Sequence, residues 1–157
     1  MRLALLIGGT VLLDQLTKLW IQMRFLYSEK VVVVPGLFNL HYIRNTGAAW
    51  GLLAGWRLLL VLFSLAMLGL ILHRRRELFG ATSCGRAALP LLAGGIIGNL
   101  IDRVRLGYVV DFLDFYHGHW HFPAFNVADS AICIGIGLYL IGQFRQGPCA
   151  GRGDGGA

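Results

Sequence analysis

Two aspartates stand in parts of this chain that are otherwise apolar. Asp111 follows two valines and precedes Phe112, and Asp129 lies just inside an apolar run. A carboxylate at membrane depth is costly, and such groups usually mark a pathway or a reaction centre. Two carboxylates that face each other cannot both ionise easily, so they share a proton. One of them can then act as a base that activates water, and the other as an acid that polarises a carbonyl group.

The spacing of the two aspartates leaves several interpretations open. A carboxylate pair that shares one proton is the arrangement of the aspartic proteases, and a site of low dielectric constant strengthens it. Each aspartate could instead cap a helix or pair with an arginine, because structural ion pairs also hold carboxylates in unusual settings. The same two groups could also relay protons in a small proton-coupled membrane carrier, or belong to a non-catalytic membrane scaffold.

The composition of the chain indicates that lipid is its solvent. Of 157 residues, 56% are hydrophobic and 14% are charged, whereas a soluble domain carries about 25% charged residues. The net charge is +6, but no Lys/Arg stretch is interleaved with aromatic residues, so we expect no nucleic-acid partner. Three widely spaced cysteines predict neither a disulfide framework nor a zinc motif.

Four apolar stretches predict transmembrane helices. They cover residues 3–23, 52–72, 87–101 and 125–142. A helix needs about 20 apolar residues to cross the hydrocarbon core, so the third stretch is marginal. We interpret the first stretch as a retained span, because no small-residue cleavage site of a signal peptide follows it.

Arginines predict the direction in which the chain crosses the membrane. Three of them, at positions 74–76, follow the second stretch and Arg86 precedes the third, and short cationic loops stay in the cytoplasm. Both termini are then cytoplasmic, and the loops 24–51 and 102–124 lie outside. Nearly every unusual polar residue, including Asp14, Asp102, Asp111 and Asp129, consequently lies at the outer face of the membrane. This disfavours a carrier, whose carboxylates would cross the midplane.

The first outer loop predicts a small sheet. Residues 31–34 and 37–43 read as two strands about a Pro-Gly turn. Residues 45–51 predict a short interfacial helix, and the glycine-rich tail 146–157 predicts a disordered cytoplasmic segment. The fold class is therefore an all-α membrane protein of four transmembrane helices with a small extracytoplasmic β-sheet and a short interfacial helix.

Five sequence blocks, in this order, resemble the lipoprotein signal peptidase family, also called signal peptidase II. They are DQLTK at 14–18, NTGAA at 45–49, GNLIDR at 98–103, GYVVDF at 107–112 and FPAFNVADS at 122–130. The resemblance covers residues 1–145 and implies a single integral-membrane peptidase domain in the bacterial cytoplasmic (inner) membrane.

The resemblance implies an activity and a set of site residues. The activity is that of an aspartic endopeptidase that removes the signal peptide from diacylglyceryl-modified prolipoproteins, N-terminal to the lipidated cysteine, with an activated water. The partners are these substrates and membrane lipids, and we expect a monomer without metal or cofactor. The implied residues fall into three groups: catalytic Asp111 and Asp129; substrate-binding Asn45, Asn99, Arg103 and Asn126; and, as structural support, Asp14, Lys18 and Asp102.

Several of these roles have alternatives. Asp14 and Lys18 are spaced i,i+4, which favours a local ion pair. Arg103 could hold a substrate carbonyl through its forked donors, or pair with Asp102 or a lipid phosphate. Asn126 could orient an aspartate or cap the fourth helix.

Two features near the site are expected to have no part in it. Asp114 lies three residues after Asp111, and we expect it to be a solvated loop acid. His117, His119 and His121 alternate and could bind zinc from a strand. No HExxH motif or carboxylate accompanies them, so we expect a plain interfacial loop.

Overall fold

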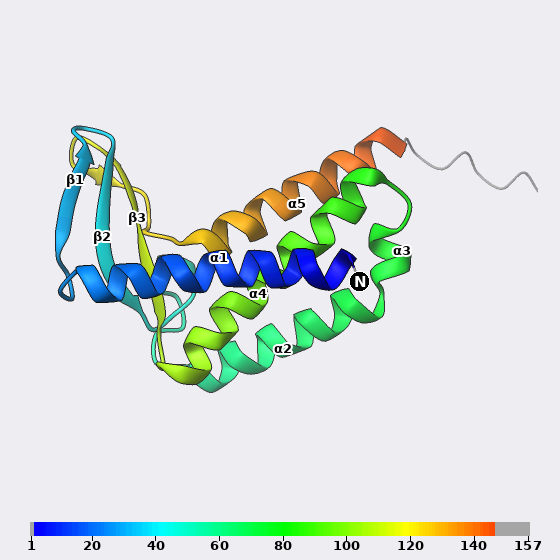
Figure 1. Ribbon diagram of the computed structural model, residues 1–157, viewed down its shortest axis with the longest axis horizontal. Coiled ribbons are helices and arrows are strands. Elements are labelled where there is room, and N and C mark those ends of the chain that lie inside the picture. Colours follow the sequence, from blue (N-terminus) through cyan, green and yellow to red (C-terminus); the bar gives the residue numbers. More distant parts are fainter. Residues whose placement is uncertain (1, 147–157) are drawn as a thin grey trace, which may run out of the picture.

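The apolar runs of the sequence form a helical bundle, and a small antiparallel sheet lies at one end of it (Figure 1). A computed structural model describes residues 2–146 of the protein. Its helices are α1 (Arg2–Arg24), α2 (Arg57–His73), α3 (Arg75–Phe79), α4 (Ser83–Arg105) and α5 (Val127–Gln146). Its strands are β1 (Lys30–Val34), β2 (Phe38–Asn45), β3 (Val109–His117) and β4 (Trp120–His121).

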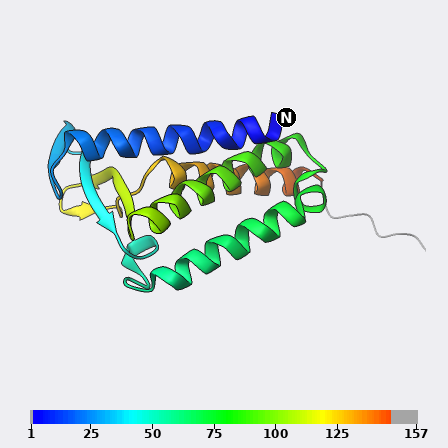
Figure 2. The same cartoon turned by 60° about the horizontal axis from the view of Figure 1, so that its bottom comes forward.

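Helix α4 is the centre of the bundle and contacts α1, α2 and α5. Figure 2 shows α1 and α2 on opposite sides of it. Small residues allow this close packing: a Cβ atom on Gly94 would lie 2.6 Å from the Cβ of Thr10 on α1, and one on Gly95 would collide with the Ala128 carbonyl oxygen on α5. Gly94 and Gly95 of α4 therefore allow the neighbouring helices to approach closely.

In the described part of the chain, three helices are long and apolar enough to cross a membrane, namely α1, α4 and α5. Helix α4 has 23 residues, so the expectation that the third stretch is marginal was wrong. It gains a turn at its start, where the Thr82 hydroxyl accepts a hydrogen bond from the Gly85 N–H at 2.8 Å and acts as a cap.

The second predicted span is shorter than expected. Helix α2 begins at Arg57, not at residue 52, and has 17 residues. The residues before it form turns in which Leu53 and Gly55 have φ angles of 58° and 86°, which a continuous helix does not allow. The count of four spans therefore stays a prediction, with α2 as the short member.

The four strands form one antiparallel sheet in the order β1-β2-β3-β4. The predicted hairpin of β1 and β2 is confirmed, with Gly36 at φ 77° in its turn. Strand β3 was not predicted, because residues 102–124 were expected to form a loop. It pairs with β2 so that Asp111 stands opposite Ile43, and Val110 and Phe112 pack against Ile21 of α1.

The predicted interfacial helix at residues 45–51 is only a three-residue 3-10 turn, η1 (Ala49–Gly51). Trp50 within it has a φ angle of 61°, so the helix cannot propagate. The chain folds back instead, and the Ala48 N–H donates to the Leu52 carbonyl oxygen at 2.7 Å. A Cβ atom on Gly47 would lie 2.6 Å from the same oxygen, so this fold requires glycine.

The two ends of the bundle differ in character. Helices α1 and α4 run toward the sheet and α2 and α5 run away from it, while α3 lies at the opposite end (Figure 1). Of the tail predicted to be disordered, Gln146 is the last residue of α5, and residues 147–157 lie outside the described part of the chain.

Replacing Gly94 with leucine should push α1 away from α4 and lower the stability of the bundle by about 1–3 kcal/mol, the usual cost of overpacking. Thermal unfolding in detergent micelles measures the loss. Gly69→Leu is the matched control, because Gly69 on α2 has no atom within 4 Å of an added Cβ. Equal melting temperatures for the two variants would contradict the close α1–α4 contact.

Candidate active site

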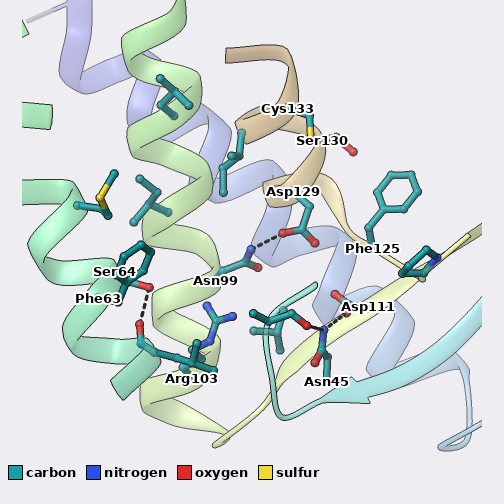
Figure 3. A pocket seen from close by; sticks show the side chains of 18 of the residues that line it. Asn45, Phe63, Ser64, Asn99, Arg103, Asp111, Phe125, Asp129, Ser130 and Cys133 are labelled. Atoms are coloured by element: carbon teal, nitrogen blue, oxygen red, sulfur yellow. Dashed lines mark hydrogen bonds between the residues drawn. The ribbon is translucent and has the colours of Figure 1, made fainter. Parts of the chain in front are cut away.

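Asp111 and Asp129 lie together at the polar end of a cavity (Figure 3). Asp111 comes from β3, and Asp129 comes from the first turn of α5. The cavity has a volume of about 770 Å³, within the range of ligand sites in proteins. Asn45, Asn99 and Arg103 line the same end, so the structure brings these sequence-predicted residues together.

The rest of the cavity is largely apolar. Its walls come from α2 and α5, and α4 lies between them; the lining side chains include Leu60, Phe63, Met67, Leu92, Ile96, Ile132 and Ile136. The cavity therefore combines a long hydrophobic surface with one end that carries two carboxylates. This combination suits a substrate with an apolar segment that ends at a polar bond.

Two asparagines hold Asp111. Asn45 Nδ2 donates to Asp111 Oδ2 at 2.9 Å, and Asn126 Nδ2 donates to Asp111 Oδ1 at 2.7 Å. Asn45 is itself fixed, because its Oδ1 accepts a hydrogen bond from the Gly47 N–H at 2.9 Å. Each carboxylate oxygen thus has one neutral donor, and the orientation of Asp111 is set from two sides.

Asn126 also caps α5. Its Oδ1 accepts from the Asp129 N–H at 3.0 Å, and Asp129 Oδ2 accepts from the Asn126 N–H at 3.3 Å. This reciprocal pair satisfies N–H groups at the start of the helix in the manner of a capping box. Both alternatives for Asn126 are confirmed, since its side chain orients Asp111 and also caps α5, which is the fourth predicted span.

Asn99 holds Asp129 on its other side. Its Nδ2 donates to Asp129 Oδ1 at 2.7 Å, while its Oδ1 accepts from Lys18 Nζ at 2.9 Å and from Asn126 Nδ2 at 3.2 Å. An ammonium group can only donate. Lys18 therefore fixes which end of the Asn99 amide faces it, and the NH₂ end must point to Asp129.

Lys18 is the centre of a buried ion cluster. Its Nζ lies 2.9 Å from Asp14 Oδ2 and 3.0 Å from Asp102 Oδ2, and the side chains of all three residues are at most 4% exposed. The predicted i,i+4 pair of Asp14 and Lys18 is confirmed. Asp102 pairs with Lys18 and not with Arg103, so the alternative ion pair of Arg103 with Asp102 was wrong.

The same cluster fastens the backbone of two further elements. Asp14 Oδ1 accepts from the Ala128 N–H on α5 at 2.8 Å, and Asp102 Oδ2 accepts from the Val110 N–H on β3 at 3.1 Å. Ala128 and Val110 each precede one of the two candidate catalytic aspartates. The cluster thus positions both carboxylates through the main chain as well as through Asn99.

Gln15 and Gly98 are supporting residues that were not among the predicted site residues. Gln15 Nε2 donates to Asp102 Oδ1 at 2.9 Å. A Cβ atom on Gly98 would lie 2.5 Å from Asp14 Oδ2. Both residues belong to the sequence blocks that carry the family resemblance, and that position was the one available signal.

Arg103 lines the cavity near its polar end (Figure 3). Its Nη2 donates to the Gly47 carbonyl oxygen at 3.2 Å, so it links α4 to the turn that follows β2. Within residues 2–146, no carboxylate lies within ion-pair distance of Arg103. Its remaining donors are available to a ligand in the cavity.

The surroundings of Asp111 favour its protonated form. Burial, and next the charge of Asp129, raise the pKa of Asp111 to about 7, although the hydrogen bonds from Asn45 and Asn126 act in the opposite direction. The carboxyl group therefore changes its protonation near neutral pH. Because the two aspartates interact, they titrate as a pair.

Asp114 differs from its prediction as a solvated loop acid. It is buried on β3, where it accepts hydrogen bonds of 2.8 Å from Asn39 Nδ2 and from His121 Nδ1. Burial raises the pKa of Asp114, but these two bonds and the nearby charges of His121 and His41 together hold the pKa below its usual value. The prediction failed because β3, the strand that buries this residue, was not recognised.

Within residues 2–146, no group of three His, Cys, Asp or Glu side chains is placed to hold a metal ion.

An apolar helical bundle with two adjoining carboxylates beside one cavity meets the requirements of a membrane-embedded aspartic protease. Comparison with known proteins agrees. The family model of Signal peptidase (SPase) II matches residues 6–145. The chain belongs to the signal peptidase II family; it is an aspartic protease of that type and a multi-pass protein of the bacterial inner membrane.

Individual relatives cover nearly the whole chain. The lipoprotein signal peptidase of Geobacter sulfurreducens is 45% identical over 141 residues, which is 88% of each chain. That of Syntrophotalea carbinolica is 47% identical over 151 residues, or 93% of each chain. A solved bacterial membrane enzyme structure superposes with a TM-score of 0.83 at 33% identity, covering 92% of this chain and 88% of the other.

Replacing Lys18 with methionine should destabilise the protein by about 3–5 kcal/mol, because Asp14 and Asp102 would remain buried without a counter-charge. Thermal unfolding in detergent micelles measures this effect. Lys30→Met is the matched control, since Lys30 is exposed on β1 and should melt like the unchanged protein. Wild-type stability of Lys18→Met would show that the cluster does not hold the helices together.

Proposed function

We propose that the protein removes the signal peptide from prolipoproteins by cutting before a cysteine that carries a diacylglyceryl group, with Asp111 and Asp129 as the catalytic pair. The observation that carries this proposal is the meeting of two carboxylates, Asp111 buried and Asp129 partly buried, at the polar end of a largely apolar cavity. The names of the relatives, lipoprotein signal peptidases, support the substrate class.

In the proposed reaction, the two aspartates act on a water molecule held between them. Asp129 serves as the base: it stands in the first turn of α5, where the helix dipole favours an anion, and Asn99 donates to it at 2.7 Å. Asp111 serves as the acid, because its pKa of about 7 keeps it protonated below neutral pH.

Bond cleavage then follows in two steps. The Asp129 carboxylate takes a proton from the water as its oxygen attacks the peptide carbonyl carbon, and Asp111 gives its proton to the carbonyl oxygen. The resulting diol collapses when Asp129 passes its proton to the leaving nitrogen and Asp111 recovers a proton from one hydroxyl group. The C–N bond breaks, and the pair regains its starting protonation.

The apolar cavity offers a place for the substrate. The signal helix would lie between α2 and α5, on the apolar side chains that line the cavity, with the acyl chains of the cysteine in lipid. Arg103 and Asn45 lie at the polar end and would hold the peptide backbone near the scissile bond. The sheet and residues 45–51 would cover the substrate from above.

We also propose that the active site faces the outer side of the membrane and that both termini are cytoplasmic. The carboxylates lie at the sheet end of the bundle, and the arginines at positions 74–76 lie at the opposite end, where α2 meets α3. Cationic segments of this kind remain in the cytoplasm. Residues 1–145 would form one peptidase domain followed by a cytoplasmic tail, and a monomer suffices because one chain supplies every proposed site residue.

Asp111→Asn and Asp129→Asn should each reduce cleavage by about 10²–10⁴-fold, the usual contribution of a general acid or base. The assay is cleavage of a diacylglyceryl-modified precursor by the full chain in vesicles. Asp114→Asn is the matched control from the same strand and should retain activity. Full activity in either dyad variant would refute the mechanism, and equally fast cleavage of an unlipidated precursor would refute the substrate class.

The rate should also depend on pH near neutrality. Below a pH of about 7 Asp111 holds its proton, and above it both aspartates are ionised and the acid is lost. The kcat/KM for lipidated precursor should therefore fall tenfold per pH unit on the alkaline side. Asp114→Asn should show the same fall of kcat/KM on the alkaline side. A kcat/KM that does not change from pH 6 to 9 would contradict the role of Asp111.

A further inference from the structure

A second polar site lies on the other face of β2 from the catalytic pair. Arg44 precedes Asn45 on this strand, and successive side chains of a strand point to opposite faces. The Arg44 guanidinium lies over three tyrosine rings, 4.7 Å from the centre of Tyr27, 5.6 Å from that of Tyr42 and 5.1 Å from that of Tyr108. These rings come from three separate segments, so the arrangement is built by the fold.

The tyrosines fix the guanidinium without neutralising it. Arg44 Nε donates to the Tyr42 hydroxyl oxygen at 3.2 Å, and no ion pair of Arg44 with a carboxylate occurs within residues 2–146. The side chain remains exposed. Its two terminal nitrogens, which have no side-chain or backbone acceptor in the described part of the chain, form the edge of the fork that binds phosphate groups in a bidentate manner.

The surroundings of this site are those of a membrane surface. Tyr27 follows the end of α1, and Tyr108 follows the end of α4; both helices are long and apolar enough to cross a membrane. Met23 and Leu26, at the end of α1, are 75% and 79% exposed. Tyrosines and arginines at such a level meet lipid headgroups, and the exposed apolar side chains beside them suit acyl chains.

We propose that Arg44 and its three tyrosines bind the phosphate diester of a phospholipid headgroup in the outer leaflet. The exposed apolar side chains favour a lipid over a free phosphate ion. Binding would fix the end of β2 at the membrane surface, and the next residue, Asn45, holds Asp111 Oδ2 at 2.9 Å. The headgroup and the catalytic pair would thus be linked through two adjacent residues of one strand.

Native mass spectrometry of the full chain, released from detergent micelles with added phosphatidylglycerol, tests the proposal. Arg44→Gln should weaken phosphatidylglycerol binding by about tenfold or more, as expected for loss of a charge-assisted contact. Arg105→Gln is the matched control. It removes the same charge from an exposed position at the end of α4, near Tyr108 in the sequence. It should change binding by less than about threefold. Equal losses in the two variants would overturn the site.

Two further measurements identify the ligand and test whether the planar guanidinium group is needed. Diacylglycerol, which lacks the phosphate, should bind without dependence on Arg44, and inorganic phosphate at the same concentration should not displace phosphatidylglycerol. Displacement by inorganic phosphate would overturn the lipid assignment. Arg44→Lys keeps the charge but loses the planar fork and should also weaken binding; wild-type binding by this variant would mean that charge alone is recognised. Binding does not depend on the proposed cleavage reaction, so it can fail or succeed separately.

Discussion

The buried ammonium group of Lys18 is the interaction on which the active-site geometry depends. An unpaired charge in this position would be very costly. The carboxylates of Asp14 and Asp102 and the side-chain oxygen of Asn99 therefore lie around it at 2.9–3.0 Å. Gathering them joins α1 to α4. Because the two acids also bind backbone N–H groups of α5 and β3, the same interaction places the segments that carry Asp129 and Asp111.

Neutral amide side chains connect the ion cluster to the catalytic pair, and their lack of charge allows one carboxyl group to stay protonated. Asn45, Asn99 and Asn126 orient the two carboxylates, yet none brings a positive charge that would force both to ionise. Asp114, three residues further along the strand, illustrates the contrast. A histidine and an amide hold the pKa of Asp114 below its usual value, whereas burial and the charge of Asp129 raise that of Asp111 to about 7.

Much of the fold could be predicted from local sequence signals. Long apolar runs predicted α1, α4 and α5, a Pro-Gly turn predicted the hairpin, and an i,i+4 spacing predicted the pair of Asp14 and Lys18. The failures at β3 and Asp114 depend on contacts between distant segments. Strand β3 carries two aspartates in an apolar run and becomes a strand only by pairing with β2; without it the burial of Asp114 could not be foreseen. The shared use of Asn126 as cap and donor likewise needs the assembled site.

If Asp111 and Asp129 share one proton, an infrared titration of the carboxyl groups in the full chain should detect it. We predict a carboxyl C=O band that disappears as the pH rises through about 7, that is absent from Asp111→Asn, and whose midpoint falls in Asp129→Asn because the neighbouring charge is gone. A midpoint unchanged by Asp129→Asn, or no titrating carboxyl band between pH 5 and 9 in the unchanged protein, would show that the two aspartates do not share a proton.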